Sequence, residues 1–280
     1  MARTKAISLI QNGATKVELS ELSNLVIANI QKDTLSGALK SQSYTGNPAA
    51  GSVEYKRFVN SVSKAYGTAR GAGKGDAIKV PPTTVNLDQH KEIVEEAARF
   101  DIDTFGIGNI MARRADNHVD TVASELDAAF FAQAVTEGTK FTATATAVDE
   151  IVEELIQTLE TVKNDYVRGV PRHLIRLVFD PSFYGKIRTF LDKGVNNANV
   201  DTAAEDFALF HGVRVYSSIN LPEGTNAICM IEGALAQPAI MYPYAEPEKI
   251  PLSNDYGVSM FFDYGTKALT PDLIFHYAQA

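Results

Sequence analysis

The chain has 280 residues, of which 45% are apolar and 21% charged, so it is long enough to bury a sizeable core and is not expected to be disordered. An excess of 34 acidic over 26 basic residues gives a net charge of −8, which disfavours dedicated binding of a polyanionic nucleic acid. No run approaches the roughly 18 apolar residues of a membrane span, and the N-terminus lacks a secretory signal. We therefore expect a globular protein of a reducing, cytoplasm-like compartment, with no membrane contact.

The first 50 residues predict one short helix followed by an extended arm. Leu19, Leu22, Val26 and Ile30 are spaced three or four apart, which is typical of a helix that buries one stripe. Residues 36–52 are rich in Ser, Thr and Gly and include a Pro, which indicates an extended segment outside any core.

A long two-stranded ribbon is predicted next. Residues 52–65 and 76–88 alternate apolar and polar side chains, and residues 67–76 between them include four glycines and almost no apolar side chain. Pro81-Pro82 removes two backbone donors, so this part of the second strand should lie at an edge or a bend. An isolated ribbon is only marginally stable, so a neighbouring subunit is the expected cover for its apolar face.

The longest predicted helix covers residues 109–137 and ends at Gly138. Before it, residues 92–98 are interpreted as a short amphipathic stretch whose acids, Glu95 and Glu96, lie on a solvated helix face. A second helix should start after Thr146, with Asp149 three residues on in capping-box spacing.

The rest of the chain predicts alternating strands and helices. Residues 173–179, 213–216 and 227–231 are expected strands, and Asp180-Pro181 should begin a helix that ends near 194. Residues 258–263 and 273–277 are predicted to pair with each other around a turn at 264–266. The fold class is α+β. The single cysteine, Cys229, lies in the apolar run 227–231 and is expected to be buried and inert.

No motif for catalysis or cofactor binding withstands inspection. Gly73-Lys74 resembles the end of a phosphate-binding loop, but Thr68 stands where that motif needs Gly and Gly75 where it needs Ser or Thr. Five scattered histidines and one cysteine match no metal spacing. The paired acids Asp101/Asp103 and Glu153/Glu154 are best interpreted as a turn and a solvated helix face. We expect no cofactor and no metal.

Basic residues collect in the ribbon, and two interpretations remain open: an electrostatic contact with an acidic neighbouring surface, or a solvated loop. The residues that we predict to contact another subunit combine these bases with apolar side chains of the ribbon. They are Tyr55, Arg57, Phe58, Arg70, Lys74, Ile78 and Val80.

Several segments, taken in order, resemble the major capsid proteins of tailed bacteriophages with the Hong Kong 97-like fold. They are Val85-Asn86-Leu87-Asp88 followed by residues 92–96, then residues 125–130, Phe179-Asp180-Pro181-Ser182, and 212–218 through 221–224. The resemblance lies in the order and spacing of these segments, since each alone is a weak signal.

The resemblance implies an N-arm (1–48), an extended β-hairpin E-loop (49–88), a peripheral domain with the long spine helix (89–140), an axial domain (141–240) and late strands returning to the peripheral domain (241–280). It also implies a coat protein that forms pentamers and hexamers of an icosahedral head around double-stranded DNA, assembled in the host cytoplasm. The implied partners are further copies of the chain, a scaffolding protein, a portal protein and, by weak non-specific contact, the DNA.

Some members of this family crosslink a ribbon lysine to an asparagine. Lys74 is suitably placed, but no acceptor can be identified in the sequence, so no such bond is predicted. Two other function classes stay open: another phage structural protein such as a tail or tube component, and a small α/β nucleotide-binding enzyme.

Overall fold

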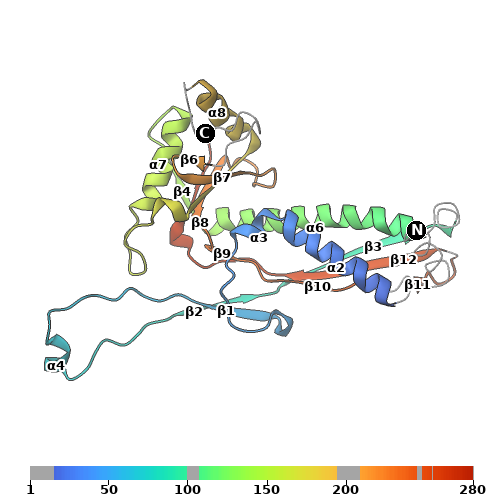
Figure 1. Cartoon of the computed structure of the whole chain (residues 1–280), viewed down its shortest axis with the longest axis horizontal. Coiled ribbons are helices and arrows are strands. Elements are labelled where there is room, and N and C mark those ends of the chain that lie inside the picture. Colours follow the sequence, from blue (N-terminus) through green and yellow to red (C-terminus); the bar gives the residue numbers. More distant parts are fainter. Residues whose placement is uncertain (1–15, 100–106, 194–208, 245–247, 254, 280) are drawn as a thin grey trace.

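The computed structural model describes residues 16–99, 107–193, 209–244, 248–253 and 255–279. The chain forms two lobes and a long projecting loop (Figure 1). One lobe is elongated and built on helix α6 (Ile107–Glu137), and the other surrounds a six-stranded sheet. The described helices include none long and apolar enough to cross a bilayer.

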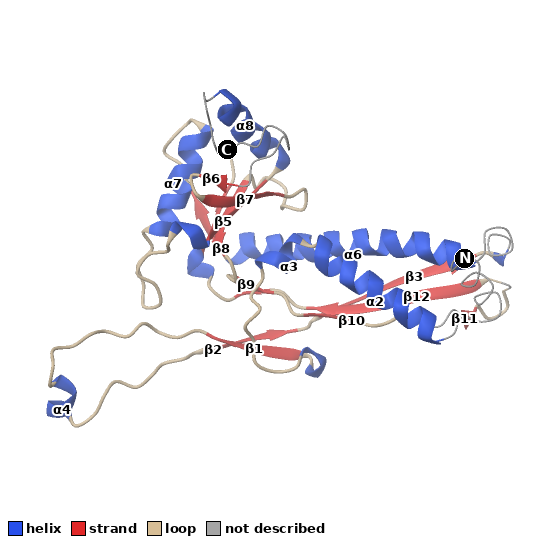
Figure 2. Ribbon diagram, in the orientation of Figure 1, coloured by secondary structure: helices blue, strands red, loops and turns tan. Residues whose placement is uncertain are grey.

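In the elongated lobe, α6 and helix α2 (Lys16–Asp33) pack on one face of a four-stranded sheet. Its central strand β12 (Tyr256–Tyr264) pairs antiparallel with β3 (Gln89–Ala97), from Tyr256↔Ala97 to Tyr264↔Gln89. The short strands β10 (Ala239–Met241) and β11 (Glu248–Lys249) pair with the other side of β12. Figure 2 shows the helices and strands of this lobe running side by side.

The predicted amphipathic stretch at 92–98 is wrong, because these residues belong to strand β3. Charged side chains conceal the two-residue alternation of this strand. Lys91 and Glu95 lie on its helix-facing side, where Lys91 pairs with Glu125 at 3.2 Å and Glu95 accepts from Arg114 Nε at 2.6 Å. Tertiary ion pairs thus allow charges on the inner face of a strand.

The second lobe has the strand order β4-β14-β8-β5-β7-β6. The strands are β4 (Thr139–Phe141), β14 (Ile274–Tyr277), β8 (Ala227–Ile231), β5 (Ile175–Phe179), β7 (Val213–Ser217) and β6 (Leu209–Phe210). Helices α7 (Val148–Glu160) and α8 (Pro181–Lys193) pack against it. Leu177 of β5 faces α7 and α8, whereas Val178 packs with Phe130 and Phe131 near the end of α6. The end of α6 therefore joins the two lobes.

The predicted helices at 19–30, 109–137 and 181–194 and the strands at 213–216 and 227–231 are confirmed, with shifted ends. Residues 173–174 instead belong to the 3-10 turn η2 (Arg172–Leu174) before β5. Asp180 begins α8 as expected, since its Oδ2 accepts from Ser182 N at 3.0 Å. Cys229 is fully buried, as predicted, and this burial raises the pKa of its thiol. The pair Asp101/Asp103 lies outside the described residues.

Two other predictions in these lobes are wrong. Residues 258–263 and 273–277 do not pair: β12 joins β3, whereas β14 joins β8 and β4 in the other sheet. The segment 241–280 is thus shared between the lobes, because β13 (Lys267–Ala268) and the 3-10 turn η3 (Pro271–Leu273) separate the two strands. The predicted second helix is present as α7, but it is preceded by Ala147, which has no side-chain cap, so the predicted capping box is not formed.

The extended segment predicted at residues 36–52 is shorter than expected. Residues Leu35–Leu39 form helix α3, and Leu39 is fully buried. Asp127 of α6 binds the start of this helix: its two carboxylate oxygens accept from Leu35 N at 3.1 Å and Ser36 N at 2.8 Å. Only the following residues continue as an irregular segment, through the 3-10 turn η1 (Pro48–Ala50).

Candidate functional site

The predicted ribbon is a short hairpin that opens into a long loop. Strands β1 (Ser52–Lys56) and β2 (Pro82–Asn86) pair over only five residues each. Beyond Lys56↔Pro82, the two arms of the loop are joined by a hydrogen bond from Val59 N to Lys79 O at 3.1 Å. The predicted strands at 52–65 and 76–88 were therefore too long, because Pro81 and Pro82 supply no N–H for further pairing. Residues 57–81 are called here the projecting loop, and its tip around residues 68–72 lies away from both lobes (Figure 1).

The tip of the projecting loop holds one short helical turn, α4 (Thr68–Ala72). Gly67 and Gly73 flank it with φ of 91° and 69°, a left-handed backbone that glycine adopts without strain. Lys74 follows in an exposed, irregular segment. A phosphate-binding loop needs a buried strand before its glycines and a full helix after its lysine, and neither is present around these residues.

Large apolar side chains of the projecting loop face solvent. Phe58 is 64% exposed, Val62 67%, Tyr66 94% and Ile78 83%. Five bases and one acid accompany them in residues 57–81. An exposed apolar surface rimmed by charge is typical of a protein interaction site.

The base of the hairpin, by contrast, is anchored inside the subunit. Val53, Tyr55 and Val85 are buried in a small cluster with Ala236 of β9 (Leu235–Ala236). A Cβ on Gly265 would lie 1.8 Å from Asn86 O, so only glycine lets the chain after β12 approach the hairpin this closely.

A second anchor holds the first arm of the loop against the six-stranded lobe. Arg57 Nη1 and Nη2 donate to the two oxygens of Asp272 at 2.6 and 2.9 Å, and the guanidinium lies 4.1 Å from the centre of the Tyr166 ring. Burial raises the pKa of Asp272, but hydrogen bonds from Arg57 and Asn164 outweigh it and hold this pKa below its usual range. Sequence reasoning missed these partners because 215 positions separate Arg57 from Asp272.

The seven predicted contact residues thus have different surroundings. Tyr55 is 5% exposed and Arg57 is paired within the chain. Phe58, Arg70, Lys74 and Ile78 are exposed, and Val80 is half-buried. The Arg70 guanidinium lies 5.7 Å from the centre of the Tyr66 ring.

The projecting loop is basic, whereas the face of the four-stranded sheet that is turned away from α6 is acidic. Val94 and Phe261 are 57% and 41% exposed there, beside the acids Glu92 and Glu96 of β3. Asp263 also lies on this face, where it contacts His90 Nδ1 and Tyr242 Oη, each at 2.8 Å. We call this surface the outer sheet face.

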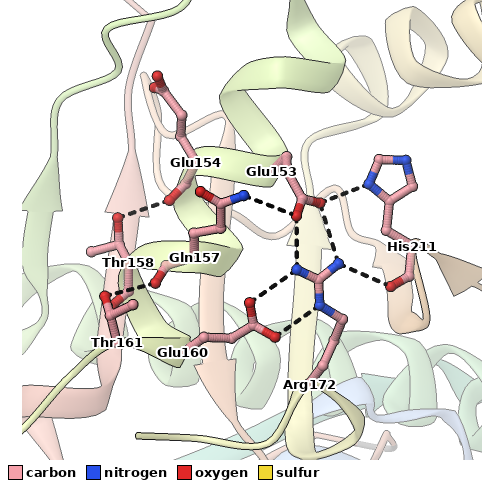
Figure 3. A network of polar contacts seen from close by, with 8 residues as sticks. All are labelled: Glu153, Glu154, Gln157, Thr158, Glu160, Thr161, Arg172 and His211. Carbon is pink, nitrogen blue, oxygen red and sulfur yellow. Dashed lines mark hydrogen bonds and ion pairs between the residues drawn. The ribbon is translucent and has the colours of Figure 1, made fainter.

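A network of ion pairs and hydrogen bonds lies within the six-stranded lobe (Figure 3). Arg172 donates to Glu160 at 2.8 and 2.9 Å and to Glu153 at 2.7 Å, and His211 Nδ1 lies 2.7 Å from Glu153 Oε2. Partial burial raises the pKa of Glu153, but hydrogen bonds from Arg172 and His211 outweigh it and lower this pKa to about 2.

Glu153 is therefore an ion-pair partner and not the solvated residue that the sequence suggested. Glu154 lies on the exposed side of α7, as expected, and accepts hydrogen bonds from Thr144 there. A carboxylate with so low a pKa is a weak base, and its oxygens are already bound by Arg172 and His211, so this network is a set of ion pairs rather than a catalytic acid–base pair. Within the described residues, no three His, Cys, Asp or Glu side chains form a group that could hold a metal ion.

Comparison with known proteins gives a consistent result. A family described as phage capsid protein matches residues 91–275, which is more than half of the chain. No curated protein matches.

Three solved structures illustrate the structural similarity. The capsid of the cyanophage P-SCSP1u has a TM-score of 0.64 at 15% identity, with 88% of each chain covered. A chain of Mycobacterium phage Che8 has a TM-score of 0.60 at 16% identity, covering 85% of this chain and 93% of the other. A virus-like particle from Pyrococcus furiosus has a TM-score of 0.56 at 12% identity, covering 92% and 97%.

At these identities the structural matches establish the fold, and the family match establishes the kind of protein. The Hong Kong 97-like fold is confirmed by the structural matches. The family match indicates a structural rather than an enzymatic protein. The chain belongs to the phage capsid protein family, which confirms its resemblance to the major capsid proteins of tailed phages.

Proposed function

We propose that many copies of this capsid protein assemble through pentamers and hexamers into a closed icosahedral head around double-stranded DNA. The observation that carries the proposal is the projecting loop, whose exposed apolar side chains at Phe58, Tyr66 and Ile78 have no cover within the described chain. A lone subunit gains no stability from such a loop, whereas a neighbouring subunit would bury it.

The outer sheet face of a neighbouring copy is the proposed acceptor. It presents Val94 and Phe261 among acids, and the loop presents apolar side chains among bases. A contact between different surfaces of identical subunits is heterologous, and such contacts form closed rings when the rotation between copies closes. We keep Phe58, Arg70, Lys74, Ile78 and Val80 as contact residues and assign Tyr55 and Arg57 to contacts within the subunit.

The domain scheme is proposed in an adjusted form. The N-arm (1–48) and E-loop (49–88) keep their bounds. The peripheral domain with the spine helix α6 (89–140) and the axial domain (141–240) shift by a few residues at their ends, because β4 pairs with the axial β14 and β10 pairs with the peripheral β12. The last segment is divided, because β12 accompanies the peripheral β3 whereas β14 completes the axial sheet. A scaffolding protein, a portal protein, weak non-specific contact with DNA and assembly in the host cytoplasm complete the proposal.

Electron microscopy of the purified chain, alone and with its scaffolding protein, tests assembly directly. Closed shells or capsomer rings are expected, whereas tubes would favour a tail component. Deleting Gly67 to Gly75 should leave a folded subunit, because this segment is exposed, yet prevent shell closure. As a matched control, replacing Thr68, Ala69 and Ala72 by Gly or Ser keeps the length of the loop and the proposed contact residues Arg70 and Lys74, and should leave shell closure intact. Normal shells from the deletion variant, or a monomer under every condition, would refute the proposal.

A further inference from the structure

The first arm of the projecting loop and one turn of the six-stranded lobe meet in a compact set of polar contacts, which we call the latch. Its members are Arg57, Asn60 and Ser61 from the loop, and Asn164, Asp165, Tyr166, Arg168 and Asp272 from the lobe. The loop could leave β1 in many directions, since the arms beyond β1 and β2 lack regular strand pairing.

The lobe side of the latch is held together by several hydrogen bonds around Asn164. Asn164 Oδ1 accepts from both Tyr166 N and Val167 N at 2.8 Å, and Asn164 N donates to Val167 O at 2.9 Å. These bonds close a tight turn between α7 and η2. Asn164 Nδ2 also donates to Asp272 at 2.5 Å, so the turn and the carboxylate hold one another in place.

The loop side is held at consecutive points. The two Arg57 nitrogens bind both Asp272 oxygens, a geometry that fixes the plane of the guanidinium against the Tyr166 ring. Asn60 N then donates to Asp165 O at 2.9 Å, and Arg168 Nη2 donates to Ser61 O at 3.1 Å. Backbone groups at 60 and 61 are thereby fixed, which sets the direction of the chain that follows.

We propose that the latch is a positioning device: it sets the direction in which the projecting loop leaves the subunit and couples that direction to the orientation of the six-stranded lobe. Arg57 and Asp272 are its central positioning residues. The loop then meets a neighbouring copy already aligned, so less conformational entropy is lost on assembly. The consequence for assembly rests on the proposed function, whereas the direction of the loop is a property of the single subunit.

Spin labels on the unassembled full chain test the direction. Cysteines introduced by Ala72→Cys at the tip and Glu150→Cys on α7 can be labelled selectively, because Cys229 is fully buried. Pulsed electron–electron double resonance measures the distance between the two labels, and the parent should give one narrow distance distribution. Arg57→Ala and Asp272→Ala should each abolish the narrow peak in favour of a broad one. Arg57→Lys, which keeps the charge but loses the two-pronged bond, should give an intermediate width.

Two variants separate the latch from general effects of charge. Lys64→Ala breaks the exposed pair with Asp76 inside the loop and should leave the narrow peak unchanged. The exchange Arg57→Asp with Asp272→Arg should restore a narrower distribution than either single change. Unchanged distributions in Arg57→Ala and Asp272→Ala would overturn the latch, whatever the chain assembles into.

Assembly of the same variants is then followed by electron microscopy. Folded Asp272→Ala chains should form fewer and less uniform shells than the parent, and the charge exchange should recover part of the loss. If the latch variants show broad distance distributions yet assemble as uniformly as the parent, the role in positioning for assembly is refuted.

Discussion

The six-stranded lobe pairs its charged residues and buries its apolar ones, whereas the tip of the projecting loop leaves both kinds exposed. In the lobe, Arg172 is held between Glu153 and Glu160, and the apolar strand β5 is buried on both faces. In the loop, Lys74 has no ion-pair partner among the described residues and Tyr66 is 94% exposed. The lobe residues therefore stabilise the subunit, whereas residues near the tip of the loop, such as Tyr66 and Lys74, are available to another molecule.

Two tyrosines of the same hairpin give the largest expected contrast. Tyr55→Ala removes a ring that is 95% buried against Val53 and Val85, and should lower the free energy of unfolding by roughly 3 kcal/mol. Tyr66→Ala removes an exposed ring and should change it by less than about 0.5 kcal/mol. Urea unfolding of the two variants measures both values. Equal losses would remove the distinction between an anchored base and a free loop.

Arg172→Ala tests the paired charges of the lobe, with a smaller expected effect. Glu153 and Glu160 would lose their shared cation, so unfolding should cost about 1–3 kcal/mol less at neutral pH. Arg172→Lys keeps the charge but loses the two-pronged bonds, so its free energy of unfolding should lie between those of the parent and Arg172→Ala. A variant as stable as the parent would show that the network contributes nothing to folding.

The same network predicts a pH dependence. Because the fold lowers the pKa of Glu153 from its ordinary 4.5 to about 2, its pairing stabilises the chain fully above pH 4.5 and is lost as the pH falls toward 2. The free energy of unfolding should therefore decline across this window. In Arg172→Ala the decline should be shallower, since the largest hydrogen-bonding cause of the shift is gone. Identical slopes for parent and variant would contradict the assignment.

Elements with a strong local signal could be predicted from the sequence. The long helix α6 has uninterrupted apolar periodicity, and Asp180-Pro181 marks the start of α8. The exposure of the glycine-rich tip also followed from its composition. Strand β3 was missed because Lys91 and Glu95 occupy its inner face, which is possible only with α6 beside it.

The anchors of the hairpin could not be predicted for the same reason. Arg57 and Tyr55 looked like free contact residues, since nothing local distinguishes them from Arg70 or Tyr66. Their partners Asp272 and Ala236 lie far along the chain, so only tertiary structure separates anchored from exposed side chains. Likewise, the partners of β12 and β14 depend on which sheet each strand reaches.

Reversing a single charge in the loop or on the outer sheet face should have the smallest effect on stability but a clear effect on assembly. Lys74→Glu lies in the exposed loop and Glu92→Lys on the outer sheet face, so each should change the free energy of unfolding by less than about 0.5 kcal/mol. Each alone should slow assembly, measured by light scattering at low salt, because it places like charges opposite one another in the proposed contact.

The double variant Lys74→Glu with Glu92→Lys restores opposite charges and should recover the assembly rate. Added salt should reduce the difference between single and double variants, because exposed charges are screened over about 10 Å at 0.1 M. Lys32→Glu, a reversal in α2 away from both surfaces, is the matched control and should leave the rate near that of the parent. A double variant that assembles no faster than Lys74→Glu would exclude Glu92 as the acceptor, and with it the pairing of the loop with this part of the outer sheet face.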